Sequence, residues 1–546
     1  MTGAQVSHTR RWVRLAAAVG ALCIATAAAT SGAFASTRDR VRHQQGGGTL
    51  TFGLEAETTS YCISSAQLAI SGIQVVSAVY DTLTVPNSKG EAVPYLAKSV
   101  EPSADFTEWT ITLRDGVTFH DGTPLDAAAL KLNLDSWRGA PGAPNVGPLL
   151  PVVFREVKDV QIVDPKTVKV IWNVPVADFA NGLYGVGRFG IMAPAQLNSN
   201  DCATNMIGTG PFELEEYKQN EATTVVKNPD YWQKGYPKVD RIRFVPVVDG
   251  AARVTQLQGG ELDLMHTSGA LQIDSLRSLG DQVKVLEQKP GFREIRYYFL
   301  LSDVPPFNDP DARAAFATAV DRAKINQIRN KGIFDVANGL MDRAAPGYVK
   351  NAGYPKYNLK KAKQLVAKVK AKTGSFDVIL GTTTDPDNSA EAQLLKEQLE
   401  AAGINAQIAQ FDQATLINRA LARAVDVLFW RNLHGGFSQH NNADTYVWFA
   451  NKDTGNILNF AGFNDATTQS LLETGRGESD LPQVKKTYQD FNRAIAKGLY
   501  LLPMWFVNWT IGSQPNVKVA FPPLPDGGGK PAFIYGRIPV LGLRGG

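Results

Sequence analysis

The stretch from Phe376 to Trp430 alternates between strand-like and helix-like patterns, and this order limits the possible folds more than any other feature of the chain. Three short apolar runs, FDVILGTT, INAQIAQF and VDVLFW, have the composition of strands. Two helical segments lie between them: SAEAQLLKEQLEAAG, which ends at Gly403, and TLINRALARA. This β-α-β-α-β order predicts an α/β domain with parallel strands.

The two halves of the chain differ in periodicity. In the second half, Asp309 and Pro310 start a segment with the 3.6-residue period of a helix. Its apolar positions are Ala312, Ala315, Phe316, Ala319, Val320 and Ala323. In the first half, DFTEWTITLRDGVTF alternates apolar and polar residues, as a half-buried strand does, and TLTFGL resembles a first strand. We therefore expect two lobes of unlike architecture, without an internal repeat.

The stretch GVTFHDGTPL, residues 116–125, places His120 beside Asp121, which raises the question of a catalytic or metal-binding pair. RDG and HDG flank VTF and supply two turns, so the pattern is that of a hairpin. The distance in sequence from His120 to His266 has no metal-ligand spacing. We interpret His120 and Asp121 as structural, and we expect a helix after them, with Thr123 as its cap and Pro124 at its first position.

The N-terminus has the pattern of a secretory signal. A basic start precedes an apolar run from Leu15 to about Ala29, and an A-x-A cleavage pattern follows at residues 33–35. The run is shorter than the roughly 20 residues that span a bilayer, which argues against a membrane anchor. We expect residues 1–35 to be removed and residues 36–48 to form a flexible leader, so that the protein reaches the periplasm or the cell surface.

The export route has two interpretations. The stretch at residues 9–11, TRR, loosely resembles a twin-arginine signal, but an ordinary basic start fits it better. Leu22 precedes Cys23 where a lipoprotein site has a small residue, so we expect no lipid anchor.

Composition and charge favour a folded protein that does not bind nucleic acid. The chain has 546 residues, of which 44% are hydrophobic and 20% are charged, enough for two or three globular domains. The formal net charge of +4 includes Arg10, Arg11 and Arg14 of the signal, and without them it is about +1. A polyanion binder needs a concentrated basic face, so we expect no nucleic-acid partner.

The cysteines are consistent with export. Removal of the signal takes away Cys23 and leaves Cys62 and Cys202, which can form one disulfide in an oxidising compartment. Two unpaired buried thiols are the alternative. The chain has no C-x-x-C, so we expect no metal role for its cysteines.

One short motif imitates a cofactor site. GVGRFG, residues 185–190, matches the dinucleotide pattern G-x-G-x-x-G, but it opens no long helix and Pro194 interrupts soon after. The strand, glycine loop and helix that the pattern requires are missing, so we expect no cofactor.

Four stretches share the pattern of one protein family. They are PYLAKSVEPSADFTEWTITLRDGVTFHDGTPLDA from residue 94, GTGPFELEEYKQNEATTVVKNPDYW from 208, LQGGELDLM from 257 and PPFNDPDARAAFATAVDR from 305. In this order they resemble the peptide/nickel class (family 5) of extracellular solute-binding proteins, which serve ABC importers. The resemblance covers nearly all of the mature chain.

The resemblance implies a two-lobed α/β fold of the periplasmic-binding-protein type (type II), with an inserted subdomain, a hinge and a ligand cleft between the lobes. It also implies that the FHDG hairpin is scaffold. The implied lobe I comprises 49–93, 206–296 and 506–546, with the inserted subdomain at 94–205, and lobe II comprises 297–505. The implied function is that of a monomeric receptor, without catalysis, which captures a peptide or small polar solute and delivers it to an ABC permease and its ATPase.

The candidate ligand contacts follow from the strand ends and from the resemblance. In open α/β sheets, ligands lie beyond the carboxyl ends of strands, which singles out the residues at and after VDVLFW. The resemblance adds the segment after the first strand, one face of RYYFLL and the strand PMWFVNW. The candidates are Thr59, Tyr61, Tyr297, Phe299, Trp430, Arg431, Asn432, His434 and Trp505. For the aromatic residues, core packing is the alternative.

Two departures from the family pattern bear on the ligand. Peptide-binding members carry an acidic residue just after the tryptophan of this junction, whereas here no acid occurs before Asp444. They also hold a glutamate where this chain has Phe299. Because a buried charge needs a partner, these losses weaken the case for a free α-amine. An aromatic, partly basic pocket would suit a neutral or anionic ligand, such as a modified peptide, a sugar-like solute or an opine-like molecule.

Two other functions are weaker alternatives. A nickel or metal-chelate receptor of the same fold would use His434 and His440, but HGGFSQH lacks the helical i, i+4 spacing that places two ligands on one face. A secreted hydrolase would need a catalytic motif, and neither G-x-S-x-G nor H-E-x-x-H occurs.

Overall fold

The computed structural model describes most of the chain after the predicted leader. The described residues are 47–58, 60–66, 68–432, 438, 440, 442–533 and 540–545. The predicted signal and all but the last two residues of the predicted leader lie outside them. Among these residues, no helix combines the length and the apolar character needed to cross a bilayer.

A seven-stranded sheet forms the centre of lobe I, in the order β12-β18-β11-β1-β10-β9-β8. Strand β1, the predicted first strand, lies in the middle and runs parallel to β10 and β11, while the outer pairs are antiparallel. The strands are β1 (Thr49–Leu54), β8 (Phe212–Lys218), β9 (Ala222–Lys227), β10 (Arg241–Pro246), β11 (Leu264–Thr267), β12 (Lys284–Glu287) and β18 (Thr510–Ser513). Its helices are α1 (Ile70–Val79), α6 (Gly250–Gly259) and α7 (Ala270–Ser278).

A separate antiparallel sheet, in the order β4-β5-β7-β6, lies within the predicted inserted subdomain. Its strands are β4 (Ala97–Pro102), β5 (Glu108–Leu113), β6 (Val157–Asp164) and β7 (Thr167–Trp172). The accompanying helices are α2 (Ala127–Arg138), α3 (Leu150–Val153), α4 (Phe179–Gly182) and α5 (Pro194–Leu197). Short paired strands lie at β2 (Thr84–Pro86) with β3 (Ala92–Pro94) and at β19 (Lys518–Val519) with β20 (Leu543–Arg544).

A five-stranded sheet, in the order β15-β14-β16-β13-β17, forms the centre of lobe II. Strand β14 (Asp377–Thr383) runs parallel to β15 (Asn405–Phe411) and β16 (Val427–Asn432), which confirms the parallel α/β prediction. Strands β13 (Glu294–Leu300) and β17 (Leu501–Val507) extend the sheet in antiparallel pairing. Strand β13 begins three residues before the predicted start of lobe II at 297, and β17 ends two residues after its predicted end at 505. The bounds of lobe II stay a proposal.

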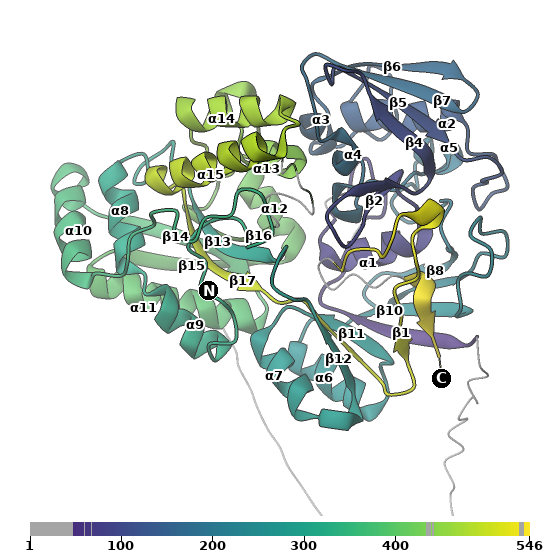
Figure 1. Ribbon diagram of the computed structural model, residues 1–546. Coiled ribbons are helices and arrows are strands. Elements are labelled where there is room, and N and C mark those ends of the chain that lie inside the picture. The colour runs from purple at the N-terminus through teal and green to yellow at the C-terminus, as the bar shows by residue number, and fades with distance from the viewer. Residues whose placement is uncertain are drawn as a thin grey trace, which may run out of the picture. The chain divides into compact units, whose positions relative to one another are not determined.

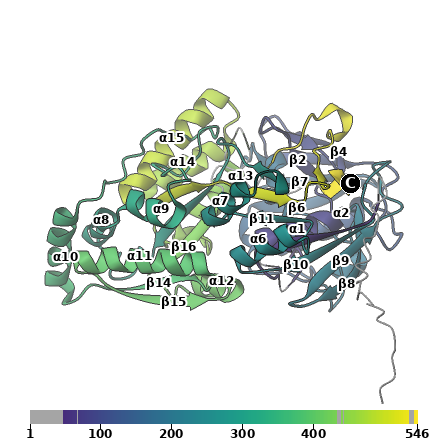
Figure 2. The same cartoon turned by 90° about the horizontal axis from the view of Figure 1, so that it is seen from below.

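Helices cover both faces of this sheet (Figure 1, Figure 2). Along one face lie α8 (Pro310–Ala319), α9 (Arg322–Asn330) and α11 (Pro386–Ala402), with α10 (Leu359–Thr373) beside them. On the other side lie α12 (Gln413–Leu421), α13 (Asn442–Phe449), α14 (Ala466–Gly477) and α15 (Leu481–Gly498). Successive side chains of a strand point to opposite faces of the sheet, which explains the two layers of helices. Tyr298 of β13 packs against Phe316 of α8, whereas the neighbouring Phe299 packs against Phe449 of α13.

Local sequence fixes the ends of these helices. The Asp385 carboxylate accepts a hydrogen bond from the backbone N–H of Asn388 and caps α11, and Pro386 occupies the first turn. Gly403 ends α11 in the left-handed region, with φ 92°. Asp309 caps α8 in the same way, as the sequence predicts.

The predicted start of α2 is wrong. The helix begins at Ala127, and its cap is Asp126, whose carboxylate accepts a hydrogen bond from Ala129 N over 2.8 Å. Thr123 and Pro124 belong instead to the hairpin, because Thr123 O accepts from Phe119 N and Pro124 pairs with Thr118. Hairpin pairing therefore holds these two residues extended, and the next good capping side chain starts the helix.

The His120 side chain forms hydrogen bonds that join the hairpin at residues 116–125 to lobe I. Its Nδ1 accepts a hydrogen bond from Gly208 N over 3.2 Å, and its Nε2 lies 3.0 Å from Gly210 O, to which the N–H donates. Asp121 accepts from the backbone and hydroxyl of Thr123. Both side chains complete turns of the scaffold, in agreement with the structural interpretation.

Acid is expected to weaken the fold through His120. Burial lowers the pKa of His120 to about 4, from about 6.5 in an unfolded chain. Between these pH values the unfolded state binds a proton that the folded state does not, so this contribution is complete above pH 6.5 and is lost as the pH falls toward 4. We expect a loss on the order of 2 kcal/mol in the free energy of unfolding. Urea denaturation of the wild type and His120→Gln at pH 7 and pH 4.5 measures it; an equal loss in both proteins would contradict this role.

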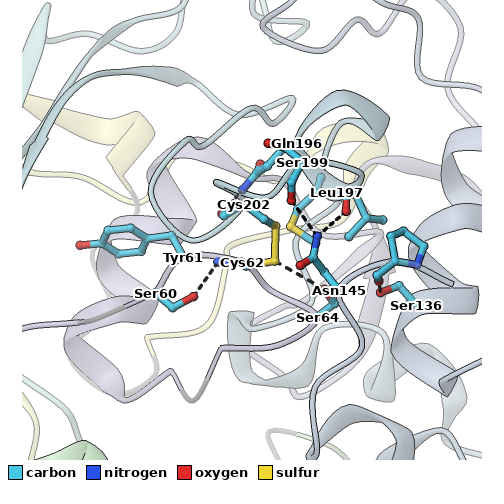
Figure 3. Close-up of a disulfide and its surroundings, with 12 residues drawn as sticks. Ser60, Tyr61, Cys62, Ser64, Ser136, Asn145, Gln196, Leu197, Ser199 and Cys202 are labelled. Atoms are coloured by element: carbon cyan, nitrogen blue, oxygen red, sulfur yellow. Dashed lines mark hydrogen bonds between the residues drawn. A yellow bond between two sulfur atoms is a disulfide. The ribbon is translucent and has the colours of Figure 1, made fainter.

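A disulfide joins Cys62 and Cys202, as the sequence predicts (Figure 3). Both residues are buried. The bond ties the loop after β1 to the far end of the inserted subdomain, where Asn145 donates hydrogen bonds to the carbonyls of Leu197 and Ser199. It therefore joins the two ends of the segment 62–202, which contains most of the predicted inserted subdomain.

Loss of this disulfide is expected to lower stability substantially. The bond closes a loop with a sequence separation of 140 residues, so its removal frees a large loop in the unfolded chain. We expect the double variant Cys62→Ala/Cys202→Ala to lose about 2–4 kcal/mol of unfolding free energy. Urea midpoints of the variant and of the oxidised wild type measure the effect, and reduced wild type should match the variant. Equal midpoints in all three samples would show that the bond adds nothing.

Candidate functional site

A cavity of about 240 Å³ lies between the lobes. Lobe I and the predicted inserted subdomain supply one wall, and β16 with the segment from α12 to α14 supplies the other. Its aromatic lining residues are Phe154, Trp172, Phe179, Tyr184, Phe189, Trp430, Tyr446, Trp448 and Phe460. A cavity of this kind, mostly apolar with few polar groups, suits a small organic guest.

On the lobe II side, Trp430, Trp448 and Phe460 form a cluster of aromatic rings in the cavity wall. The ring centroid of Trp430 lies 5.1 Å from that of Phe460 and 5.9 Å from that of Trp448. Trp430 stands near the end of β16, directly opposite Tyr297 of β13. The sheet therefore holds this ring from behind while its other side lines the cavity.

The opposing wall comes from the predicted inserted subdomain. Trp172 is the last residue of β7, and its ring packs edge-on against Phe179 of α4 at 5.0 Å. Apolar residues of α3, such as Leu150 and Val153, continue this wall. The cavity thus lies between two groups of aromatic residues that are about 260 positions apart in the sequence.

Polar contacts join the lobes at the rim of the cavity. Arg155 of lobe I donates to Thr454 O over 2.6 Å and to the Tyr446 hydroxyl over 3.1 Å. Asp178 accepts from the Ser438 hydroxyl over 3.0 Å, and Ala177 N donates to Arg476 O over 2.8 Å. These bonds join residues of the two lobes, so they form only when the lobes are together.

The chain crosses between the two central sheets twice, between β12 and β13 and again between β17 and β18. The two crossings meet where Gln288 N donates to Trp509 O over 2.8 Å. Paired crossing segments of this kind can serve as a hinge.

Arg431 links the lobes beside these crossings. Its guanidinium donates to the Ser268 hydroxyl and lies 3.8 Å from Glu55 and 3.9 Å from Glu294. Burial raises the pKa of Glu294. Burial acts in the same direction on Glu55, but Arg253 and Arg431 outweigh it and hold the pKa of Glu55 below its ordinary value. Glu55 is thus an anion that pairs with Arg431 across the two lobes.

Comparison with known proteins identifies the family. Residues 91–456 match the family described as bacterial extracellular solute-binding proteins, family 5 Middle. The chain belongs to this family.

Known relatives agree with this assignment. The glutathione-binding protein GsiB of Escherichia coli O6:K15:H31 is 28% identical over 319 residues, which are 58% of this chain and 60% of that protein. The chain therefore spans about 60% of the length of the curated relatives it matches.

Solved structures share the two-lobed fold. AgaA of A. tumefaciens R10, in complex with agropinic acid, has a TM-score of 0.78 and 25% identity, and the match covers 88% of this chain and 96% of AgaA. AppA of Bacillus subtilis, in complex with a nonapeptide, has a TM-score of 0.79 and 20% identity over 91% of this chain and 99% of AppA. These likenesses confirm the α/β fold of the periplasmic-binding-protein type.

Among the predicted ligand contacts of this family 5 protein, Trp430 lines the cavity. Four others are buried in the cores of their lobes: Tyr61, Tyr297, Phe299 and Trp505. The Tyr61 hydroxyl, for example, is hydrogen-bonded to Thr223. Arg431 lies in the interlobe contact described above, and Asn432 is buried at the end of β16. Thr59 and His434 fall outside the described residues. The role of these side chains in ligand contact stays a prediction.

Several lining residues of the family 5 cavity were missed by sequence reasoning. Trp448 and Phe460 lie beyond the segment that the strand-end rule singles out, although the run YVWF at 446–449 is an aromatic cluster close behind it. Trp172 and Phe179 belong to the predicted inserted subdomain, where no local sequence pattern indicates a cavity. The distance in sequence between the two walls explains why no local pattern pairs them.

A metal centre receives no support from the described residues, among which no group of three His, Cys, Asp or Glu side chains could hold an ion. His440 lies 4.0 Å from Asp178, which already accepts from Ser438. The predicted alternative with His434 as a second ligand falls partly outside the described residues.

Proposed function

We propose that this protein is an exported receptor that captures a small solute or peptide in the cavity between its lobes and delivers it to an ABC importer. The observation that carries the proposal is the cavity itself, whose aromatic walls come from both lobes. A guest there would touch both lobes at once, so it would favour the state in which they are together. Because ligand shifts such an equilibrium only through its better fit to one state, this geometry suits a capture-and-release receptor.

The proposed mechanism needs no bond making or breaking. Ligand first lies against one aromatic wall, and the lobes then close over it. Closure forms the bonds of Arg155 to Thr454 and of Asp178 to Ser438. Apolar burial supplies most of the binding free energy, at roughly 25 cal/mol per Å² of apolar surface removed from water.

We assign the ligand-contacting role first to Trp430, because it is the predicted candidate that lines the cavity. In this proposal Tyr297, Phe299 and Trp505 support the sheet behind it. Arg431 has a different role, since its contacts with Glu55 and Ser268 link the lobes near the hinge.

The comparisons support the proposed ligand class and partners. GsiB is described as glutathione-binding and AgaA as a complex with agropinic acid, which supports a small solute as the ligand. The family description as extracellular and the predicted secretory signal both support export. The partners in this proposal are a permease with its ATPase, and the receptor acts as a monomer.

Mass spectrometry of small molecules released from the denatured, purified protein tests the function. We expect a stoichiometric solute that rebinds saturably to the emptied protein in calorimetry. Incubation with peptides, esters and glycosides should leave all of them intact. Turnover of any of these compounds, or a protein that binds no solute, would refute the proposal.

A further inference from the structure

The hydrogen-bonding groups that line the interlobe cavity indicate the chemistry of its guest. Among the described lining residues, the buried side-chain atoms that lack a hydrogen-bond partner are Nε1 of Trp172, Nε1 of Trp430, and Nε and Nη1 of Arg476. All four are donors. Buried donors left unpaired cost free energy, so a guest that supplies acceptor oxygens would fit this cavity better than one that supplies donors.

Three acceptor side chains of the described cavity lining, Asp178, Tyr446 and Glu156, already lie beside donors. Asp178 accepts from Ser438 and Asn181, and the Tyr446 hydroxyl accepts from Arg155. The Glu156 carboxylate lies 3.6 Å from the Arg155 guanidinium. An amine on the guest would therefore share these acceptors with the donors already present, whereas the unpaired donors named above have no such competition.

The charged residues that line the cavity also favour a guest with acceptor oxygens. The described lining residues include three arginines, at 155, 188 and 476, and two acids, Glu156 and Asp178. Arg188 donates to Leu68 O and Arg155 to Thr454 O. The Arg476 guanidinium is stacked on the Tyr446 ring at 4.6 Å, which fixes its plane and leaves its edge for a planar anion.

We propose that the cavity takes a small organic acid whose carboxylate pairs with Arg476 and whose apolar or flat body lies between Trp430 and Trp172. This inference rests on the proposed function and names the chemical class of its solute. The two tryptophan N–H groups then donate to further oxygens of the same guest, while the aromatic walls cover its body.

A chemically modified metabolite extract tests this class directly. The probe is the small-molecule fraction of a bacterial cell extract, used as such or after carbodiimide coupling with methylamine, which converts carboxylates to neutral amides. Each sample is incubated with emptied protein, washed, and released by denaturation for mass spectrometry. We expect wild-type protein to retain a carboxylic acid from the untreated extract and about tenfold less or lower from the amidated one.

Variants connect the preference to the proposed residue. Arg476→Gln should retain about tenfold less of that acid. Trp172→Phe, which keeps an aromatic ring but removes the indole N–H, should retain about threefold less. Arg493→Gln is the control, since this arginine is exposed and pairs with Asp490 on α15. Melting temperatures of the emptied proteins check that each variant is folded.

The outcomes separate the inference from the function. Retention of a neutral or cationic solute, retention that amidation leaves unchanged, or an Arg476→Gln variant that equals the wild type would each overturn the acid proposal while the receptor function stands. Wild-type protein that retains nothing from either extract would overturn the receptor function as well.

Discussion

Trp430→Ala is expected to weaken solute binding about 100-fold, which corresponds to about 2.7 kcal/mol. The indole is part of the cavity wall, where it packs against Trp448 and Phe460. Its removal takes away a large contact area and widens the cavity, so the guest loses both packing and exclusion of water. Calorimetric titration with the solute released from the wild-type protein measures the change.

The stability of the emptied Trp430→Ala protein should fall much less than its affinity. The side chain is only partly buried, and its loss enlarges a cavity that is already present. A loss of about 1 kcal/mol in unfolding free energy is therefore the expected upper range.

Trp232→Ala is the matched control for this experiment. Trp232 is also partly buried, but it lies away from the cavity, where its Nε1 donates to the buried Asp81 over 2.8 Å. This variant should lose stability, because Asp81 loses a donor, and should keep its affinity within about twofold. If instead Trp430→Ala loses as much stability as Trp232→Ala and keeps its affinity, Trp430 is a packing residue and not a ligand contact.

The local sequence carried enough information to predict the framework of lobe II. Period and caps identified α8 and α11, and the β-α-β-α-β order identified the parallel core of the sheet. The strand-end rule led to Trp430 for the same reason, because a residue at the carboxyl end of β16 lies at the edge of the sheet. These features depend on neighbours in sequence.

What could not be predicted depends on contacts between distant segments. Arg155 meets Tyr446 across 291 positions, and neither residue carries a local sign of that contact. The same holds for Arg476, whose position at the end of α14 resembles that of an ordinary surface arginine. The error at Thr123 has a different, local cause, because a hairpin pairing with Thr118 and Phe119 overrode a good capping signal.

Glu391→Gln is expected to lower the free energy of unfolding by about 3–5 kcal/mol. The Glu391 side chain is fully buried on α11 and accepts from Arg296 over 3.0 and 3.1 Å and from the Tyr298 hydroxyl over 2.8 Å. Arg329 lies 3.3 Å from its other side. This carboxylate contacts both arginines, and the other carboxylate near them, Asp387, lies 3.9 Å from Arg329. Neutralisation of Glu391 therefore leaves more buried positive charge than Asp387 alone can balance. Urea denaturation at neutral pH measures the loss.

The functional consequence of this loss follows from the strand register. Arg296 stands directly opposite Arg431, and the next pair in the register is Tyr297 with Trp430. The Glu391 cluster therefore supports, from behind, the two strands that present the cavity wall and the interlobe contact. We expect Glu391→Gln to weaken solute binding as well, through a less ordered β16.

Two further variants separate charge from a general effect of mutating α11. Glu397→Gln removes an exposed carboxylate six residues away on the same helix and should change stability by no more than about 0.5 kcal/mol. The double variant Glu391→Gln/Arg296→Met removes one of the uncompensated charges and should recover part of the loss. If the double variant is less stable than Glu391→Gln by the full cost of a second independent mutation, the two side chains are not energetically coupled, and the cluster does not act as a buried ion pair.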